Sequence, residues 1–274
     1  MSDTAQLALT EYLAAAAAAG LLRQVDGAHY VAAEQIEPNT GERYCFVEFC
    51  DSPLLTCREL REAFLLALAA EFPWAESAVV CTSAHADLDL HWQRLLTYYL
   101  WTPARLAPAQ PYRPEVRPAT DLELPRLVNW LARSFTGTAA QPAQRATDPA
   151  QLATGILAEP DRRSWISWSG AEAVGHATVL TGALDLIRGQ RFIELLDILV
   201  EPDRDDRRER AAELLAAVQG YAASVRKPLL SNVVHLRGDL ETVSRDWQVA
   251  DTLHQTGWTE CDVYYCAQLP RSAP

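Results

Sequence analysis

The chain has 274 residues, 49% of them hydrophobic and 22% charged, which is the composition of a folded protein with one large domain or two. Its formal net charge of −12 argues against broad contact with nucleic acid or anionic membranes. The charge is uneven, because residues 1–110 carry 6 basic and 14 acidic side chains and residues 111–274 carry 18 and 22. The second part is therefore the better candidate for binding an anion.

The cysteines and one apolar segment bear on location and metal binding. The six cysteines form no CxxC pair and no zinc-like spacing with histidine, so we expect free, mostly buried thiols in a reducing compartment and no metal site. The Ala-rich segment Leu13–Leu22 is too short to span a bilayer, and Glu11 precedes it where a signal peptide would carry basic residues. We expect a cytoplasmic protein with a helix at this segment.

In the first part of the chain, alternating apolar residues predict strands and a 3.6-residue period predicts helices. Residues 102–118 are rich in proline without a helical period, which predicts a linker, and we place a domain boundary near residue 110. The elements expected before it are a hairpin of strands Tyr30–Ile36 and Arg43–Phe49, a helix begun by a capping box at Thr56–Glu59, a strand at Ala78–Thr82, a helix at 88–97 and a strand at Tyr98–Leu106.

In the second part, hairpins are mixed with helical crossovers. This order predicts an α/β (α+β) fold with a mixed, mostly antiparallel twisted sheet flanked by helices. The first part of the chain repeats the later portion of this order of strands and helices, which favours a tandem repeat. The alternative is that the first part is one unrelated α/β domain. The expected elements are strands at Glu115–Arg117, Ser164–Trp168, Ala173–Leu180, Phe192–Val200, Leu229–His235 and Trp258–Leu269, with helices after a capping box at Thr120–Glu123, at 150–158, at Ala211–Val225 and at Val243–Leu253.

Four segments in the second part resemble one known family. VRPATDLELPRLVNWLARSF (116–135), AEAVGHATVL (171–180), IELLDILVEP (193–202) and QTGWTECDVYY (255–265) are similar, in order and spacing, to the core of the Gcn5-related N-acetyltransferase (GNAT) superfamily. The resemblance covers about residues 113–270. It implies a GNAT-like acyltransferase domain at 111–274, and the repeated order of elements extends the expectation to a degenerate GNAT-like domain at 1–110.

The resemblance implies a site for coenzyme A after the apolar strand that ends at Val200. The family holds the pyrophosphate with a Gln/Arg-x-x-Gly-x-Gly/Ala loop at a helix N-terminus, where free N–H groups and the helix dipole favour anions. Aligned on Arg207–Ala212, the chain keeps the first and last positions but has Arg210 where glycine would let the backbone approach the phosphates. The residues implied in binding acetyl-coenzyme A or another acyl-coenzyme A are Leu199, Val200, Arg207, Arg208, Arg210, Ala211 and Ala212.

The charge of this loop leaves an alternative open. Asp203, Asp205, Asp206 and Glu209 accompany its arginines and can cancel their charge. The loop is therefore either a phosphate site or a solvated, self-paired loop.

Glu194 is the candidate catalytic residue. The family often carries a glutamate early in this strand, where it deprotonates the acceptor amine. Asp197 lies three residues further on and is expected on the opposite face of the strand, so the two should not form an acid–base pair. The position of the family's general acid, a tyrosine, holds Leu253, so that role is unassigned.

The first functional hypothesis is acyl transfer, most simply of acetyl, from coenzyme A to the amine of a small molecule. One alternative is a non-catalytic GNAT-like binding module, consistent with the missing glycine and tyrosine. Another is a GNAT-fold enzyme with a different thioester donor, in which the loop arginines would meet an acidic carrier protein.

Overall fold

The computed structural model of the chain describes residues 3–36, 41, 43–83, 88, 91–103, 115–138, 148–235 and 250–270. Most of the predicted linker and the predicted domain boundary near residue 110 lie outside these residues. Most of the helix predicted at Val243–Leu253 also lies outside them, and its described end, residues 250–255, is helical.

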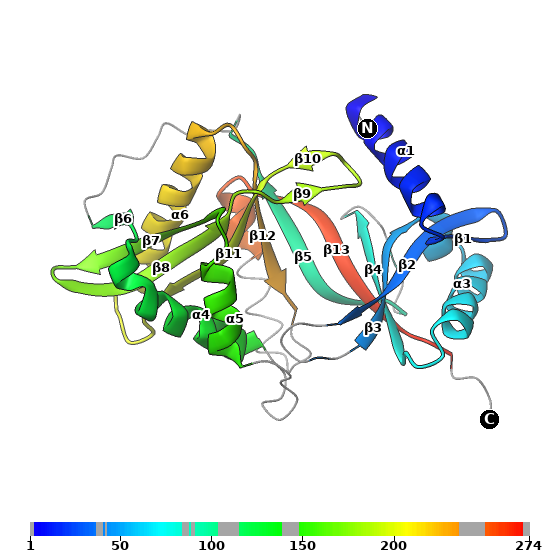
Figure 1. Cartoon of the computed structure of the whole chain (residues 1–274), viewed down its shortest axis with the longest axis horizontal. Helices are drawn as coiled ribbons and strands as arrows, with labels where there is room; N and C mark the ends of the chain where they lie inside the picture. Colours follow the sequence, from blue (N-terminus) through cyan, green and yellow to red (C-terminus); the bar gives the residue numbers. More distant parts are fainter. Residues whose placement is uncertain are drawn as a thin grey trace.

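Among the described strands, 11 form one sheet that runs through both parts of the chain (Figure 1). Adjacent strands in this sheet are antiparallel except for the parallel pairs β3–β4 and β11–β12. This agrees with the mixed, mostly antiparallel sheet that the sequence predicted. A two-stranded hairpin, β9–β10 (Leu184–Asp185 and Gln190–Arg191), forms separately. The strands, in sheet order, are β1 (Leu22–Val25), β2 (Ala28–Ile36), β3 (Arg43–Cys50), β4 (Ser77–Ser83), β13 (Thr259–Gln268), β5 (Gln93–Trp101), β12 (Leu229–Val234), β11 (Ile193–Val200), β8 (Glu172–Leu180), β7 (Arg162–Ser169) and β6 (Val116–Pro118).

Helices cover both faces of the sheet. The first face carries α3 and α6, and the second carries α4 and α5 over β7, β8 and β11. No helix among the described residues is long and apolar enough to cross a membrane. The helices are α1 (Asp3–Ala18), α2 (Pro53–Thr56), α3 (Arg58–Glu71), the 3-10 turn η2 (Asp121–Glu123), α4 (Leu124–Thr138), α5 (Pro149–Leu157) and α6 (Arg207–Ser224).

The two parts of the chain repeat one crossover and exchange a strand. β3–α3–β4 and β11–α6–β12 are both a strand, a helix and a parallel strand. Beyond these units, β5 of the first part pairs with β12 of the second, and β13 of the second part lies between β4 and β5 of the first (Figure 1). The sheet therefore joins both parts, and each contributes a strand to the other.

Three apolar clusters hold the layers together. Phe64 and Leu68 of α3 pack on Val47, Val80 and Val263. A second cluster packs α6 on β5, β11 and β12, and a third packs α4 and α5 on β7, β8 and β11. Burial of such side chains is worth about 1.5–3 kcal/mol each, so β13, which supplies Val263, stabilises a core made mostly by the first part of the chain.

Two predictions for the first part are wrong. Within the helix predicted at 88–97, β5 begins at Gln93 and pairs with β12 and β13, so strand pairing overrides the local pattern. The capping box at Thr56–Glu59 does not form: Thr56 belongs to α2 and donates to the carbonyl of Ser52, and Cys57 precedes α3 without a side-chain cap. The capping box at Thr120–Glu123 is confirmed, with both reciprocal hydrogen bonds present.

A β-bulge interrupts β11 between Leu195 and Asp197. A bulge adds one residue and reverses the alternation beyond it. Ile193 and Leu195 before it and Ile198 and Val200 after it accordingly share the α6 cluster. The prediction that Glu194 and Asp197 face opposite sides is therefore wrong, because the inserted residue brings both to the face opposite α6.

Candidate functional site

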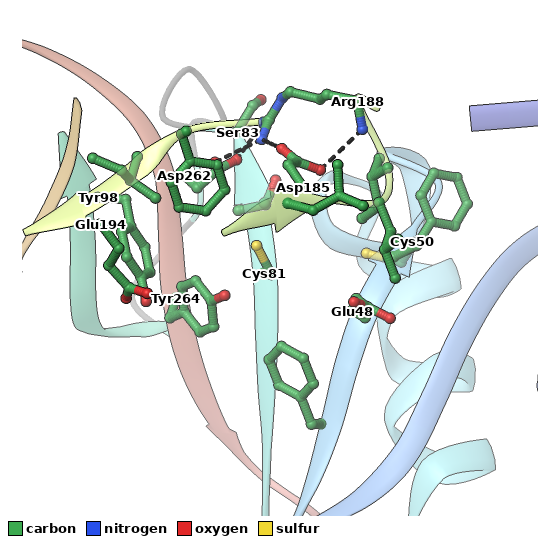
Figure 2. A pocket seen from close by; sticks show the side chains of 18 of the residues that line it. Glu48, Cys50, Cys81, Ser83, Tyr98, Asp185, Arg188, Glu194, Asp262 and Tyr264 are labelled. Atoms are coloured by element: carbon green, nitrogen blue, oxygen red, sulfur yellow. Dashed lines mark hydrogen bonds and ion pairs between the residues drawn. The ribbon is translucent and has the colours of Figure 1, made fainter. Parts of the chain in front are cut away.

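A cleft of about 590 Å³ lies on the sheet face opposite α3 and α6. Its floor is formed by β3, β4, β13, β5, β12 and β11, which are consecutive in the sheet. In β3 and β13 a cleft residue follows a core residue: Glu48 follows buried Val47, and Tyr264 follows buried Val263. The strand exchange thus creates a site lined by both parts of the chain, as Figure 2 shows.

Glu194 stands at one end of the cleft (Figure 2). Its strand pairs with β12 only at Ile193 and Glu194, so the two parallel strands separate directly after it. The side chain is half-buried, and burial raises the pKa of its carboxyl above the ordinary value. The cleft therefore holds a partly desolvated carboxylate beside the opening between β11 and β12.

Three aromatic rings cross the floor from β3 to β5. Phe46 and Tyr264 stack with centroids 5.7 Å apart, and Tyr264 and Tyr98 lie 5.5 Å apart. Burial, followed by the charge of Glu194, raises the pKa of Tyr98. Burial also raises the pKa of Tyr264, and that of the neighbouring Cys81 thiol to about 12. All three hydrogen-bonding groups are thus neutral donors at neutral pH.

The β9–β10 hairpin forms a wall of the cleft and is tied to its floor by Arg188. The Arg188 Nη1 lies 2.8 Å from Asp262 Oδ2 on β13 and 2.7 Å from Asp185 Oδ2 on the hairpin. The hydrogen bond with Asp262 is the largest cause of the raised pKa of Arg188. This guanidinium is fully engaged by two carboxylates, so it closes the wall and offers little to an anionic ligand.

Glu48 stands across the cleft from Glu194 (Figure 2). Its Oε2 accepts a hydrogen bond of 2.7 Å from the Tyr12 hydroxyl on α1. Burial, followed by that contact, raises the pKa of Tyr12. In the described part of the chain neither Glu48 nor Glu194 has a salt-bridge partner.

The residues expected to hold coenzyme A gather near the end of β11 and the start of α6. Arg207 and Arg208 are exposed in the first turn of α6. Arg204 and Arg210 instead bind the Asp206 carboxylate, at 2.8 Å and 3.0 Å, and Arg210 also binds Glu213 at 3.1 Å. The self-paired alternative thus describes part of this loop, while two arginines stay exposed.

The other expected residues are partly accessible. Val200 is buried in the α6 cluster, and Leu199 packs with the α4–α5 cluster. Both pair with β8 on one edge of β11, and among the described strands none pairs with their other edge. Ala212 is exposed on α6, and Ala211 is half-buried. The N-terminus of α6 lacks a side-chain cap, since the Asp206 carboxylate is held by arginines.

A buried polar chain adjoins the bulge. Asp197 Oδ2 accepts a bond of 2.7 Å from Ser134 of α4 and lies 3.1 Å from Nε2 of fully buried His176. The other ring nitrogen of His176 lies 3.1 Å from the Thr178 hydroxyl, and Trp130 stacks on the ring. Asp197 is therefore committed to holding α4, β8 and β11 together, and it forms no pair with Glu194.

Sequence reasoning proposed Glu194, which lines the cleft, but it missed most of the other residues there. Tyr264 lies in the segment 255–265 that carries the family resemblance, but no role in a site was predicted for it. Their neighbours come from distant segments that strand exchange brings together, and the alternation of buried and half-buried residues was the one signal available. The cleft residues that were missed are Phe46, Glu48, Cys81, Tyr98, Asp185, Arg188 and Asp262.

Comparisons with known proteins place the fold. No family model and no curated protein matches the chain. A GNAT-family acetyltransferase from Colwellia psychrerythraea is similar with a TM-score of 0.51 and 12% identity, over 91% of this chain and 84% of its own. A GCN5-related N-acetyltransferase from Sphaerobacter thermophilus is similar with a TM-score of 0.51 and 12% identity, over 90% and 79%.

A conserved protein of unknown function from Staphylococcus epidermidis is similar with a TM-score of 0.52 and 10% identity, over 87% of this chain and 90% of its own. Each likeness extends over both parts of the chain. At these identities a likeness concerns the fold alone. The chain has a GNAT-like fold.

Proposed function

We propose that the protein transfers an acyl group, most simply acetyl, from coenzyme A to the amine of a small molecule. The observation that carries the proposal is the place of Glu194, a carboxylate of raised pKa in a large cleft, where β11 and β12 separate. The GNAT-like fold supports the same reading by analogy.

Glu194 would act as the general base. An amine must lose a proton to attack a thioester, and a carboxylate whose pKa lies nearer neutrality is the more effective base. The amine nitrogen bonds to the acyl carbonyl carbon, Glu194 takes its proton directly or through water, the C–S bond breaks and the thiolate of coenzyme A leaves. Tyr98 and Tyr264 line the same cleft, and their neutral hydroxyls are available to hydrogen-bond that thiolate as it leaves.

Acyl-coenzyme A would lie along the open edge of β11 and reach the start of α6. The backbone of Leu199 and Val200 would hold the pantetheine arm. Arg207 and Arg208, with the uncapped N–H groups that precede Ala211 and Ala212, would hold the pyrophosphate. Arg210 would contact phosphate only by giving up Asp206 or Glu213.

A non-catalytic GNAT-like binding module is the second candidate, because the Asp206 carboxylate stands at the helix end where the pyrophosphate would lie. An acyl carrier protein as donor finds no particular support among the described contacts. Both alternatives predict that free acetyl-coenzyme A does not bind.

Calorimetric titration of acetyl-coenzyme A tests the proposal. We expect micromolar binding that Arg207→Ala weakens and Glu194→Gln preserves, with transfer to amines lost in Glu194→Gln. Arg58→Ala is the matched control, because Arg58 is an exposed arginine that also stands in the first turn of a helix, but in α3 of the first part of the chain. No heat at millimolar ligand would refute direct use of coenzyme A.

A further inference from the structure

We infer that the cleft takes an elongated amine with a second positive charge, of the diamine or polyamine class, held between Glu194 and Glu48 along the aromatic floor. The inference rests on the proposed function in one respect only, which is that the bound amine is taken to be the acceptor of the acyl group. Binding of the dication follows from the lining of the cleft.

The charges of the cleft select a cation. Four carboxylates and one guanidinium are among the described residues that line it. Arg188 is engaged by Asp185 and Asp262, which leaves the carboxylates of Glu48 and Glu194 without a cationic partner in the described chain. An ammonium group of the ligand would give each of these two carboxylates a cationic partner.

The floor between these carboxylates suits a chain of methylene groups. Phe46, Tyr264 and Tyr98 form a continuous row of rings from the strand of Glu48 to the strand beside β12. Aromatic faces attract ammonium ions by about 0.5–2 kcal/mol and also cover apolar surface. Burial raises the pKa values of both tyrosines, so their rings stay neutral and the attraction of the floor for a cation comes from the ring faces.

The geometry requires a long molecule. Glu48 lies on β3 and Glu194 on β11, with β4, β13, β5 and β12 between them. An amine that places one nitrogen at Glu194 for acylation therefore reaches Glu48 only through an extended linker. Tyr12 holds one oxygen of Glu48 and leaves the other free for the distal ammonium.

Titration of amines without any acyl donor tests the inference. Diaminooctane, spermine and the monoamine octylamine are titrated into the unmodified protein, Glu48→Gln, Phe46→Leu and the control Glu62→Gln. Glu62 is an exposed glutamate of α3 on the opposite face, so its variant makes the same change of charge away from the cleft. Thermal unfolding of each variant verifies that it is folded.

We expect the tighter of diaminooctane and spermine to bind roughly tenfold or more tightly than octylamine, as one charge-assisted contact would give. Glu48→Gln should remove this preference and leave octylamine binding unchanged, Glu62→Gln should keep it, and Phe46→Leu should weaken all three amines. Equal affinity for octylamine and the dications, or equal effects of Glu48→Gln and Glu62→Gln, overturns the inference.

Acetyl-coenzyme A titrated into the same samples separates the two proposals. Dication binding without coenzyme A binding would leave the cleft inference standing and remove the acyl transfer. Coenzyme A binding without a preference for dications would do the reverse.

Discussion

Replacing Gly175 by alanine probes the contact between β8 and the proposed coenzyme A edge of β11. Gly175 pairs with Val200. A Cβ at this position would lie 2.6 Å from the backbone oxygen of Leu199 and 3.0 Å from Val200 Cγ2. The first contact is with backbone, so a side-chain rotation cannot relieve it.

The size of the effect follows from that clash. To reach even 3.0 Å, β11 must move by about 0.4 Å at Leu199. Overpacking of this kind costs about 1–3 kcal/mol of unfolding free energy. Because small misplacements near reacting groups cost large factors in rate, we expect acetyl transfer to fall on the order of tenfold.

Urea unfolding followed by circular dichroism measures the first effect, and acetyl-coenzyme A titration with transfer kinetics measures the second. Gly155→Ala is the control, since nothing lies within 4 Å of its new Cβ in α5. Removing a helical glycine should raise stability by about 0.5–1 kcal/mol. A Gly175→Ala protein as stable as the unmodified one would refute the close approach of β8 to β11.

Three further changes test other parts of the structure. Glu194→Gln should raise the melting temperature at neutral pH. Burial raises the pKa of the Glu194 carboxyl in the folded state, so the carboxylate costs stability increasingly as pH rises above about 4.5. A difference in melting temperature between Glu194→Gln and the unmodified protein that does not shrink on acidification would contradict this reasoning. Asp197→Ala should lower the unfolding free energy by about 1–3 kcal/mol by removing the acceptor of one Ser134 hydrogen bond and the carboxylate beside His176 Nε2. Asp197→Asn, which keeps one acceptor oxygen, should cost less, and equal losses would count against the polar chain. Deleting residues 259–274 should abolish cooperative unfolding, because β13 pairs with both β4 and β5; a truncated protein with unchanged near-ultraviolet dichroism would show that β13 is dispensable.

Local pattern in the sequence was enough to predict much of the second part of the chain. The apolar run at Ile193–Val200, the helical period of α6 and the capping box at Thr120–Glu123 each depend on neighbours a few residues away. Glu194 was identified because its place in the strand resembles a family pattern. The first part was predicted less well, since β5 is fixed by pairing with strands far along the chain.

The sequence by itself determined which residues form strands and helices in most places, because burial on one face imposes a period of 2 or 3.6 residues. Only the tertiary structure decided which strands are neighbours. The insertion of β13 between β4 and β5 brings Tyr264 beside Phe46 and Tyr98, and the bulge in β11 turns Asp197 to the face of Glu194. Periodicity indicates that a side chain is covered but not which strand lies beside it. The cleft depends on which strands are adjacent, so periodicity alone could not predict it.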